Sequence, residues 1–167
     1  MITRILQESD AQLYQEVRLS GLKTNPEAFG STYDRESNFS LDAVKERIRP
    51  NKDKFVLGAF LENGTLSGIV TFVRETGIKT SHKGNVYGMY VTQEMRGKGL
   101  GRVLMLELIR EARECDGLEQ LNLIVVSNNE SAKKLYRSVG FDVYGVERRA
   151  LKYNGQYYDE DLMVLRL

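Results

Sequence analysis

The stretch that decides the fold reads Arg-Gly-Lys-Gly-Leu-Gly, residues 96–101. A run of β-branched and aromatic residues, 85–91, precedes it, and apolar residues with helical spacing begin at Leu100. A strand, a glycine-rich turn and a helix in this order bring backbone N–H groups and the helix N-terminus to one point. Glycines also let a phosphate approach the backbone closely. The segment therefore predicts a phosphate site, with Arg96 and Lys98 supplying positive charge.

Two better-known phosphate motifs do not fit this spacing. No Ser or Thr follows Lys98, so the P-loop pattern Gly-x-x-x-x-Gly-Lys-Ser/Thr is not met. The order Gly-x-Gly-x-Gly misses the dinucleotide fingerprint by one position. The spacing therefore argues against a P-loop kinase and a dinucleotide-dependent dehydrogenase.

Apolar patterns on both sides of the segment predict an α/β fold. Strands are expected at about residues 1–6, 55–61, 66–73, 85–91, 121–126, 141–146 and 158–167, and helices at about 10–22, 40–48, 100–115 and 132–139. Asn-Gly pairs at 63–64 and 154–155 indicate hairpin turns. The strand, helix and strand of 85–126 imply a parallel pair. We expect one domain over 1–167, with a mixed, mostly antiparallel sheet, a central parallel pair and helices on both faces.

Composition excludes several classes of protein. The chain has 167 residues, with 24 Lys and Arg against 23 Asp and Glu, so its formal charge of +1 favours neither nucleic acid nor an anionic membrane as a partner. No long apolar run predicts a membrane helix, and the first residues lack the pattern of a secretory signal. Cys115 and His82 are the only Cys and His, too few for a usual zinc site. We expect a cytoplasmic protein without a metal.

Three separate motifs resemble those of one family. Arg96, Gly99 and Gly101 meet the pattern Gln/Arg-x-x-Gly-x-Gly/Ala. Tyr90-Val91 precedes it, and residues 129–141 contain Asn-x-x-Ala-x-x-Leu-Tyr leading into Gly-Phe. On these matches, which cover about residues 86–141, the chain resembles the GNAT superfamily of N-acetyltransferases. The earlier part of the chain resembles the family mainly in the order of its elements.

The resemblance implies acetyl-CoA held between two parallel strands that splay apart, with the pantetheine arm pairing along the open strand. Gly88, within that strand, fits a bulge or a close ligand approach, and equally a crowded neighbour. The cofactor-binding residues implied by the resemblance are Met89, Tyr90, Val91, Arg96, Gly97, Lys98, Gly99, Leu100, Gly101, Asn129 and Lys134.

The same resemblance implies direct transfer of the acetyl group to a primary amine, with Tyr136 as the general acid. Its helical spacing also suits a packing role on an apolar face, and the surrounding motif favours the catalytic one. The general base is open, because 85–91 and 121–126 contain no carboxylate. A water chain, deprotonation in bulk solvent, Asp34, Glu36 or the acidic cluster 159–161 are the alternatives.

The acceptor is expected to bind at the less regular parts of the chain, the loop 23–39 and the hairpin near 153–161, because loops on a rigid scaffold set specificity. Tyr33 and Glu36 are the candidate substrate-binding residues. A small molecule and a protein N-terminus or lysine both remain possible acceptors. The resemblance also implies a homodimer. The alternative function is a non-catalytic acyl-CoA-binding or regulatory module, which the intact Asn129 and Tyr136 disfavour.

Overall fold

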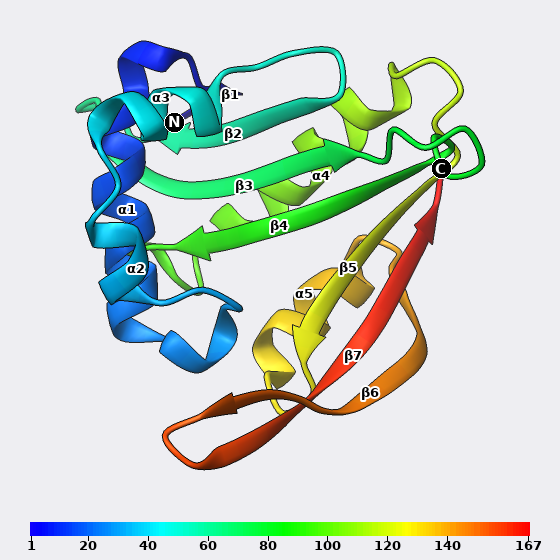
Figure 1. Ribbon diagram of the computed structural model, residues 1–167. Helices are drawn as coiled ribbons and strands as arrows, with labels where there is room; N and C mark the ends of the chain where they lie inside the picture. The colour runs from blue at the N-terminus through cyan, green and yellow to red at the C-terminus, as the bar shows by residue number, and fades with distance from the viewer.

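Seven strands form one mixed sheet in the computed structural model, which describes residues 1–167 (Figure 1). The spatial order is β1-β2-β3-β4-β5-β7-β6, and only β4 and β5 run parallel. This confirms the predicted mixed sheet with a central parallel pair. The strands are β1 (Ile2–Ile5), β2 (Lys54–Phe60), β3 (Leu66–Arg74), β4 (Lys83–Val91), β5 (Gln120–Val126), β6 (Asp142–Tyr153) and β7 (Gln156–Arg166).

Helices cover both faces of the sheet, as expected (Figure 1). They are α1 (Ala11–Thr24), α2 (Tyr33–Ser37), α3 (Leu41–Ile48), α4 (Leu100–Arg113) and α5 (Glu130–Ser138), with 3₁₀ turns at Glu8–Asp10, Pro26–Ala28 (η2) and Gln93–Met95. Strand β2 is buried on both sides: Leu57 packs in the core that α4 covers, and Val56 packs in the core of α1 and α3. Side chains alternate along a strand, so these two cores lie on opposite faces of the sheet.

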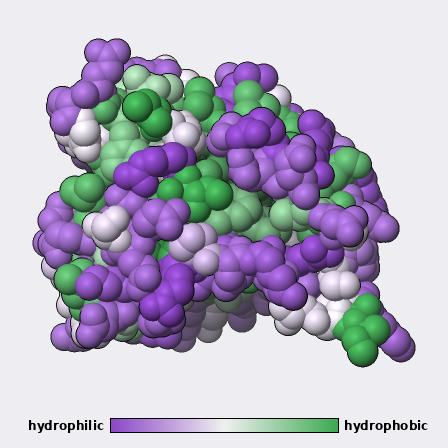
Figure 2. Space-filling view, turned by 90° about the horizontal axis from the view of Figure 1, so that it is seen from above, coloured by the Kyte–Doolittle hydropathy of each residue, from purple (hydrophilic) through white to green (hydrophobic).

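The surface is rich in charged and polar side chains. Viewed from above, hydrophilic residues dominate, and hydrophobic ones gather in several groups between them (Figure 2). None of the helices has the length and apolar character needed to cross a lipid bilayer.

Strands β4 and β5 pair only at one end. Their register joins Lys83–Asn85 to Gln120–Asn122, after which β4 continues to Val91 without a partner on that side. A bulge accompanies the divergence, because β4 places two residues, 88 and 89, where β3 has one. Gly88 has a φ of 59°, a conformation that favours glycine, so of the alternatives considered for this glycine the structure shows the bulge.

Two segments differ from the prediction. The stretch 23–39, expected to be a loop, contains η2 and the five-residue helix α2. Strand β6 runs to Tyr153 instead of ending near 146, so β6 and β7 form one long hairpin. Its turn is the predicted Asn154-Gly155 pair, in which both residues have positive φ values, 49° and 76°.

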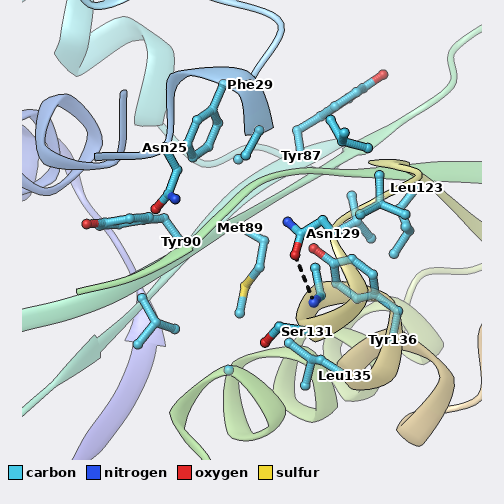
Figure 3. Close-up of a pocket in the computed structure, with 18 of the residues that line it drawn as sticks. Asn25, Phe29, Tyr87, Met89, Tyr90, Leu123, Asn129, Ser131, Leu135 and Tyr136 are labelled. Atoms are coloured by element: carbon cyan, nitrogen blue, oxygen red, sulfur yellow. Dashed lines mark hydrogen bonds between the residues drawn. The ribbon is translucent and has the colours of Figure 1, made fainter. Parts of the chain in front are cut away.

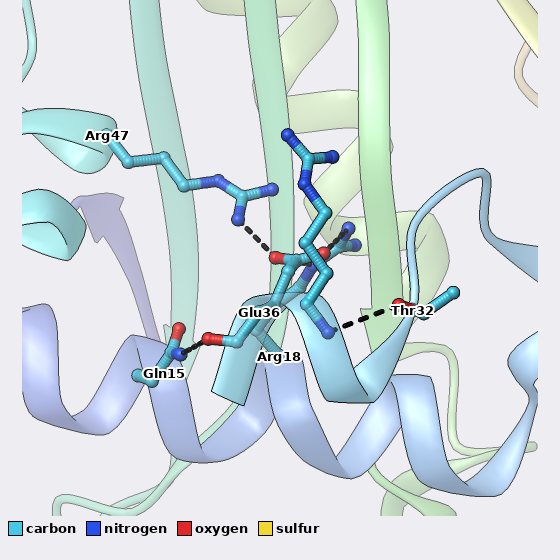
Figure 4. Close-up of polar contacts among 6 residues, drawn as sticks. Gln15, Arg18, Thr32, Glu36 and Arg47 are labelled. Carbon is cyan, nitrogen blue, oxygen red and sulfur yellow. Dashed lines mark hydrogen bonds and ion pairs between the residues drawn. The ribbon is translucent and has the colours of Figure 1, made fainter. Parts of the chain in front are cut away.

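A buried ion pair explains why α2 forms. The Glu36 side chain is 1% exposed and lies between Arg18 of α1 and Arg47 of α3 (Figure 4). Arg18 donates from Nε and Nη2 to the two carboxylate oxygens at 3.1 and 2.8 Å, and Arg47 donates to one of them. Gln15 also donates to the Glu36 carbonyl at 2.7 Å. A helix of five residues is not stable alone, so these contacts hold it in place.

The two arginines keep Glu36 ionised. Burial by itself disfavours the charged carboxylate, but hydrogen bonds and positive charge from Arg18, with Arg47 adding to them, lower its pKa from 4.5 to about 2. One carboxylate faces two guanidinium groups, so the network of Arg18, Glu36 and Arg47 carries a net positive charge.

We predict that Glu36→Gln lowers the free energy of unfolding by about 3 kcal/mol at pH 7, because it leaves two arginines without their counter-charge. Urea denaturation measures the loss. A group with a depressed pKa stabilises the fold above its unfolded pKa, so the wild-type stability should fall as the pH drops from about 4.5 toward 2. The variant should show a weaker drop in that range.

Glu107→Gln is the matched control, because it removes a carboxylate that pairs with Arg110 on the surface of α4. Exposed pairs contribute at most about 1 kcal/mol. Equal effects of the two substitutions would contradict the structural role of Glu36.

Candidate active site

A cleft of about 670 Å³ opens where β4 and β5 diverge. Its walls come from the second half of β4, the end of β5, the start of α4, helix α5 and the segment around η2. Figure 3 shows Met89 of β4 and Tyr136 of α5 on facing sides of this space. The two splayed strands implied by the family resemblance therefore frame a real cavity.

At Tyr90, the β4 wall of the cleft presents backbone atoms and not the side chain. On its other edge β4 pairs with β3, where Ile69 is opposite Tyr90. The Tyr90 side chain is 5% exposed, and its hydroxyl lies 3.3 Å from Ser20 Oγ and 3.2 Å from Thr24 Oγ1 of α1. Tyr90 therefore contributes main-chain atoms to the cleft, while its ring anchors α1 to the sheet.

The N-terminus of α4 leaves backbone donors free in the wall of the cleft. The first helical hydrogen bond runs from Val103 N–H to the Gly99 carbonyl, at 3.1 Å. The preceding N–H groups of Leu100, Gly101 and Arg102 have no backbone acceptor. Gly97 and Gly99 have φ values of 73° and 82°, which only glycine adopts easily, and no atom lies within 4 Å of where their Cβ would be. The turn thus leaves space and donors for a phosphate.

The charges around this site differ from those expected. Arg96 lines the cleft, but its Nε donates to the Val91 carbonyl at 3.1 Å and its Nη2 to Asn25 Oδ1 at 2.7 Å. Its guanidinium therefore ties the segment before η2 to the end of β4. Arg102, in the first turn of α4, lines the cleft, although no motif pointed to it.

Two lysines expected at the cofactor lie elsewhere on the surface. Lys98 and Lys134 are both exposed, and neither lines the cleft.

Tyr136 reaches the cleft from α5. Its side chain is 8% exposed, and its ring meets that of Phe141 edge-on, with the centroids 6.2 Å apart. The hydroxyl makes no hydrogen bond with another residue of the chain. Burial raises its pKa to about 12, so the phenol stays protonated at neutral pH. The packing role and the proton-donor role considered from the sequence are therefore compatible in this structure.

Asn129 caps α5 and also faces the cleft. Its Oδ1 accepts a hydrogen bond from the Ala132 N–H at 3.2 Å, the dashed line in Figure 3. The amide nitrogen of the same side chain has no partner in the chain, so it is available as a donor to a ligand.

The two residues expected to bind the acceptor do not line the cleft. Tyr33 lies beneath Lys23, whose Nζ is 4.7 Å from the ring centroid. The Glu36 carboxylate is fully engaged by the two arginines, so its expected role in substrate binding finds no support in its position. Sequence alone did not reveal this, because the burial of Glu36 depends on the packing of three helices.

Other side chains line the cleft in their place. Arg18 and Phe29 lie there, together with Tyr87 of β4 and Glu160 of β7. Arg18 uses Nε and Nη2 for Glu36, while Nη1 has no partner and lies 3.4 Å from the point where a Cβ of Gly88 would be. The missing side chain at the bulge thus leaves this nitrogen open to the cleft.

Comparison with known proteins gives the family. Residues 16–141 match the model of the acetyltransferase (GNAT) family, so the chain belongs to this family. The sequence is 31% identical over 106 residues to L-amino acid N-acyltransferase MnaT of Escherichia coli K12, a match covering 64% of this chain and 61% of that protein. The matched region thus spans about three fifths of this relative.

Solved structures agree with the fold. An acetyltransferase of the GNAT family from Streptococcus pneumoniae has a TM-score of 0.85 at 24% identity, and the match covers 99% of both chains. The structure of yncA from Salmonella typhimurium, with its cofactor acetyl-CoA, has a TM-score of 0.82 at 25% identity, covering 100% of this chain and 94% of that one.

We predict that Arg102→Ala weakens binding of coenzyme A about tenfold at low salt, because a charge-assisted bond to a phosphate is lost. The difference in coenzyme A affinity between the wild type and the variant should shrink in about 0.5 M salt, because salt screens exposed charges. Isothermal titration calorimetry measures both. Arg113→Ala, at the far end of the same helix, is the control. If the two variants bind coenzyme A equally well, the phosphates do not lie at the start of α4.

Proposed function

We propose that this protein is an acetyl-CoA-dependent N-acetyltransferase that acetylates the primary amine of a small molecule. The observation that carries the proposal is the meeting, in one cleft, of an unpaired strand edge, a helix N-terminus with free N–H groups and the free hydroxyl of Tyr136. Membership of the GNAT family supports the same activity.

Each part of the cofactor has a complementary surface. The pyrophosphate suits the free N–H groups of residues 100–102 with Arg102 beside them. The pantetheine arm carries amides, which suit the open edge of β4 at Met89–Val91 in the manner of an added strand. Asn129 supplies a side-chain donor on the opposite wall.

The chemistry is direct attack on the thioester. The amine nitrogen forms a bond to the acetyl carbon, and the bond from that carbon to sulfur breaks. Tyr136 gives its phenolic proton to the departing thiolate, whose conjugate acid has a pKa of roughly 8.5. A phenol with a pKa near 12 is a weak acid, so the donation depends on the negative charge that develops on sulfur as the bond breaks.

An amine that also carries a carboxylate is the acceptor class that the cleft favours. The open Nη1 of Arg18 belongs to a buried network of net positive charge, which suits an anionic group. The relative MnaT is named as an L-amino acid N-acyltransferase, which points the same way.

Cellular location and assembly are also part of the proposal. The single, unpaired Cys115 supports a cytoplasmic location. Exposed hydrophobic side chains on the β6–β7 hairpin, among them Tyr144, Val146 and Tyr157, support a homodimer. A solution mass near the 19.1 kDa of one chain would contradict the dimer.

The activity is tested by thiol release from acetyl-CoA with a panel of amines. We expect release with L-amino acids, and at least tenfold lower kcat/KM with the matching amines that lack the carboxylate. Tight binding of acetyl-CoA with no release for any amine would instead support a non-catalytic acyl-CoA-binding module.

We predict that Tyr136→Phe lowers kcat about 100-fold while the Kd of acetyl-CoA changes less than twofold, since the substitution removes only the proton donor. Wild-type activity should show no loss from ionisation of this tyrosine up to about pH 11, because its pKa is about 12. Tyr144→Phe, on the exposed face of β6, is the control. Unchanged kcat for Tyr136→Phe between pH 6 and 9 would rule out the proton-donor role.

A further inference from the structure

Acetylation releases a proton from the amine nitrogen, and the cleft contains few groups able to accept it. Its lining residues include no His, Asp, Lys or Cys. The arginines at 18, 96 and 102 carry guanidinium groups, which only donate hydrogen bonds, and a phenolic hydroxyl is a far weaker base than a carboxylate. Glu160 is the only carboxylate among the lining residues.

The two acids beside Glu160 are engaged elsewhere. Asp159 accepts hydrogen bonds from Arg148 Nη1 at 3.0 Å and from the Arg149 N–H at 2.9 Å. Asp161 is 5% exposed, and it pairs with Lys133 at 2.9 Å and with Ser127 Oγ. Glu160 makes no hydrogen bond or ion pair within the chain, so its carboxylate is available to a ligand.

The alternation of side chains along β7 places Glu160 on the side opposite α5. Asp161 contacts Lys133 of α5, so its neighbour Glu160 projects from the other face of the sheet. In the ladder Glu160 is opposite Val126, near the end of β5 where the strands have diverged. Tyr136 enters the cleft from the α5 side. The proton donor and Glu160 therefore approach the cleft from opposite faces of the sheet.

The surroundings of Glu160 make it a better proton acceptor than an ordinary surface carboxylate. Burial raises its pKa, and the nearby carboxylate of Glu147, its ladder partner on β6, raises it further. On the other neighbouring strand, β5, the opposite residue is the apolar Val126. A general base gains strength as its pKa rises toward the working pH.

We propose that Glu160 is the general base of this enzyme, receiving the proton that the amine nitrogen loses as its bond to the acetyl carbon forms. The inference rests on the proposed acetyltransferase function. The nitrogen donates its electron pair to the carbonyl carbon, the bond from that carbon to sulfur breaks, and the thiolate takes a proton from Tyr136. Glu160 accepts the N–H proton as the nitrogen becomes that of an amide. Solvent then returns a proton to Tyr136 and removes one from Glu160.

The test compares Glu160→Gln with Asp142→Asn in the full chain, using acetyl-CoA and the best amine acceptor of the wild type. Both substitutions remove one negative charge from the β6–β7 hairpin, but Asp142 lies opposite Val164, away from Glu160, and does not line the cleft. We expect Glu160→Gln to lower kcat at least 100-fold, with acetyl-CoA affinity and thermal stability unchanged and the acceptor KM within threefold. Asp142→Asn should retain kcat within twofold.

The pH profile gives a readout that a structural role would not produce. In the wild type, kcat should fall at acidic pH as Glu160 becomes protonated. This fall should disappear in Glu160→Gln, and Glu160→Asp should recover part of the rate that Glu160→Gln loses. Unchanged kcat, or a raised acceptor KM with kcat intact, would overturn the base role and leave the acetyltransferase function standing. A wild type that releases no thiol with any amine would instead overturn the proposed function itself.

Discussion

The loss of pairing between β4 and β5 after Asn85 is the constraint on which the site depends. Two parallel strands that stayed paired to their ends would close the sheet and leave no cavity. The bulge at Gly88 adds one residue to β4 relative to β3, which bends the strand away from β5. The divergence costs backbone hydrogen bonds on the open edge of β4. There the Val91 carbonyl accepts a hydrogen bond from Arg96 Nε, and other main-chain groups of Met89–Val91 are left for a ligand.

The rest of the fold is arranged around this opening. Helix α4 follows β4 and delivers its N-terminus to one end of the cleft, while α5 follows β5 and brings Tyr136 to one side. On the other face, the ion pairs of Glu36 with Arg18 and Arg47 hold α1, α2 and α3 together, and Arg18 also lines the cleft. Because β7 pairs along the whole of β5, Glu160 has a fixed place at the mouth.

Much of this architecture is readable from the sequence, because regular apolar spacing, Asn-Gly turns and the glycine segment each report local physics. The short helix at 33–37 was missed, because it is held by the tertiary contacts of Glu36 and not by its own propensity. The side-chain contacts of Arg96 also depend on tertiary packing. The acidic cluster was noticed, but selecting Glu160 from it requires the face that each residue of β7 presents, which only the ladder and the partner of Asp161 reveal.

The central claim is that one cleft holds acetyl-CoA with its thioester between groups on opposite faces of the sheet. A crystal structure with bound acetyl-CoA tests it most directly. We expect the pantetheine amides to hydrogen-bond to the main chain of Met89–Val91, and the thioester sulfur to lie within about 4 Å of the Tyr136 hydroxyl. We also expect the open face of the acetyl carbon to point toward Glu160. A thioester lying away from Tyr136, or a cofactor bound outside the divergence of β4 and β5, would contradict it.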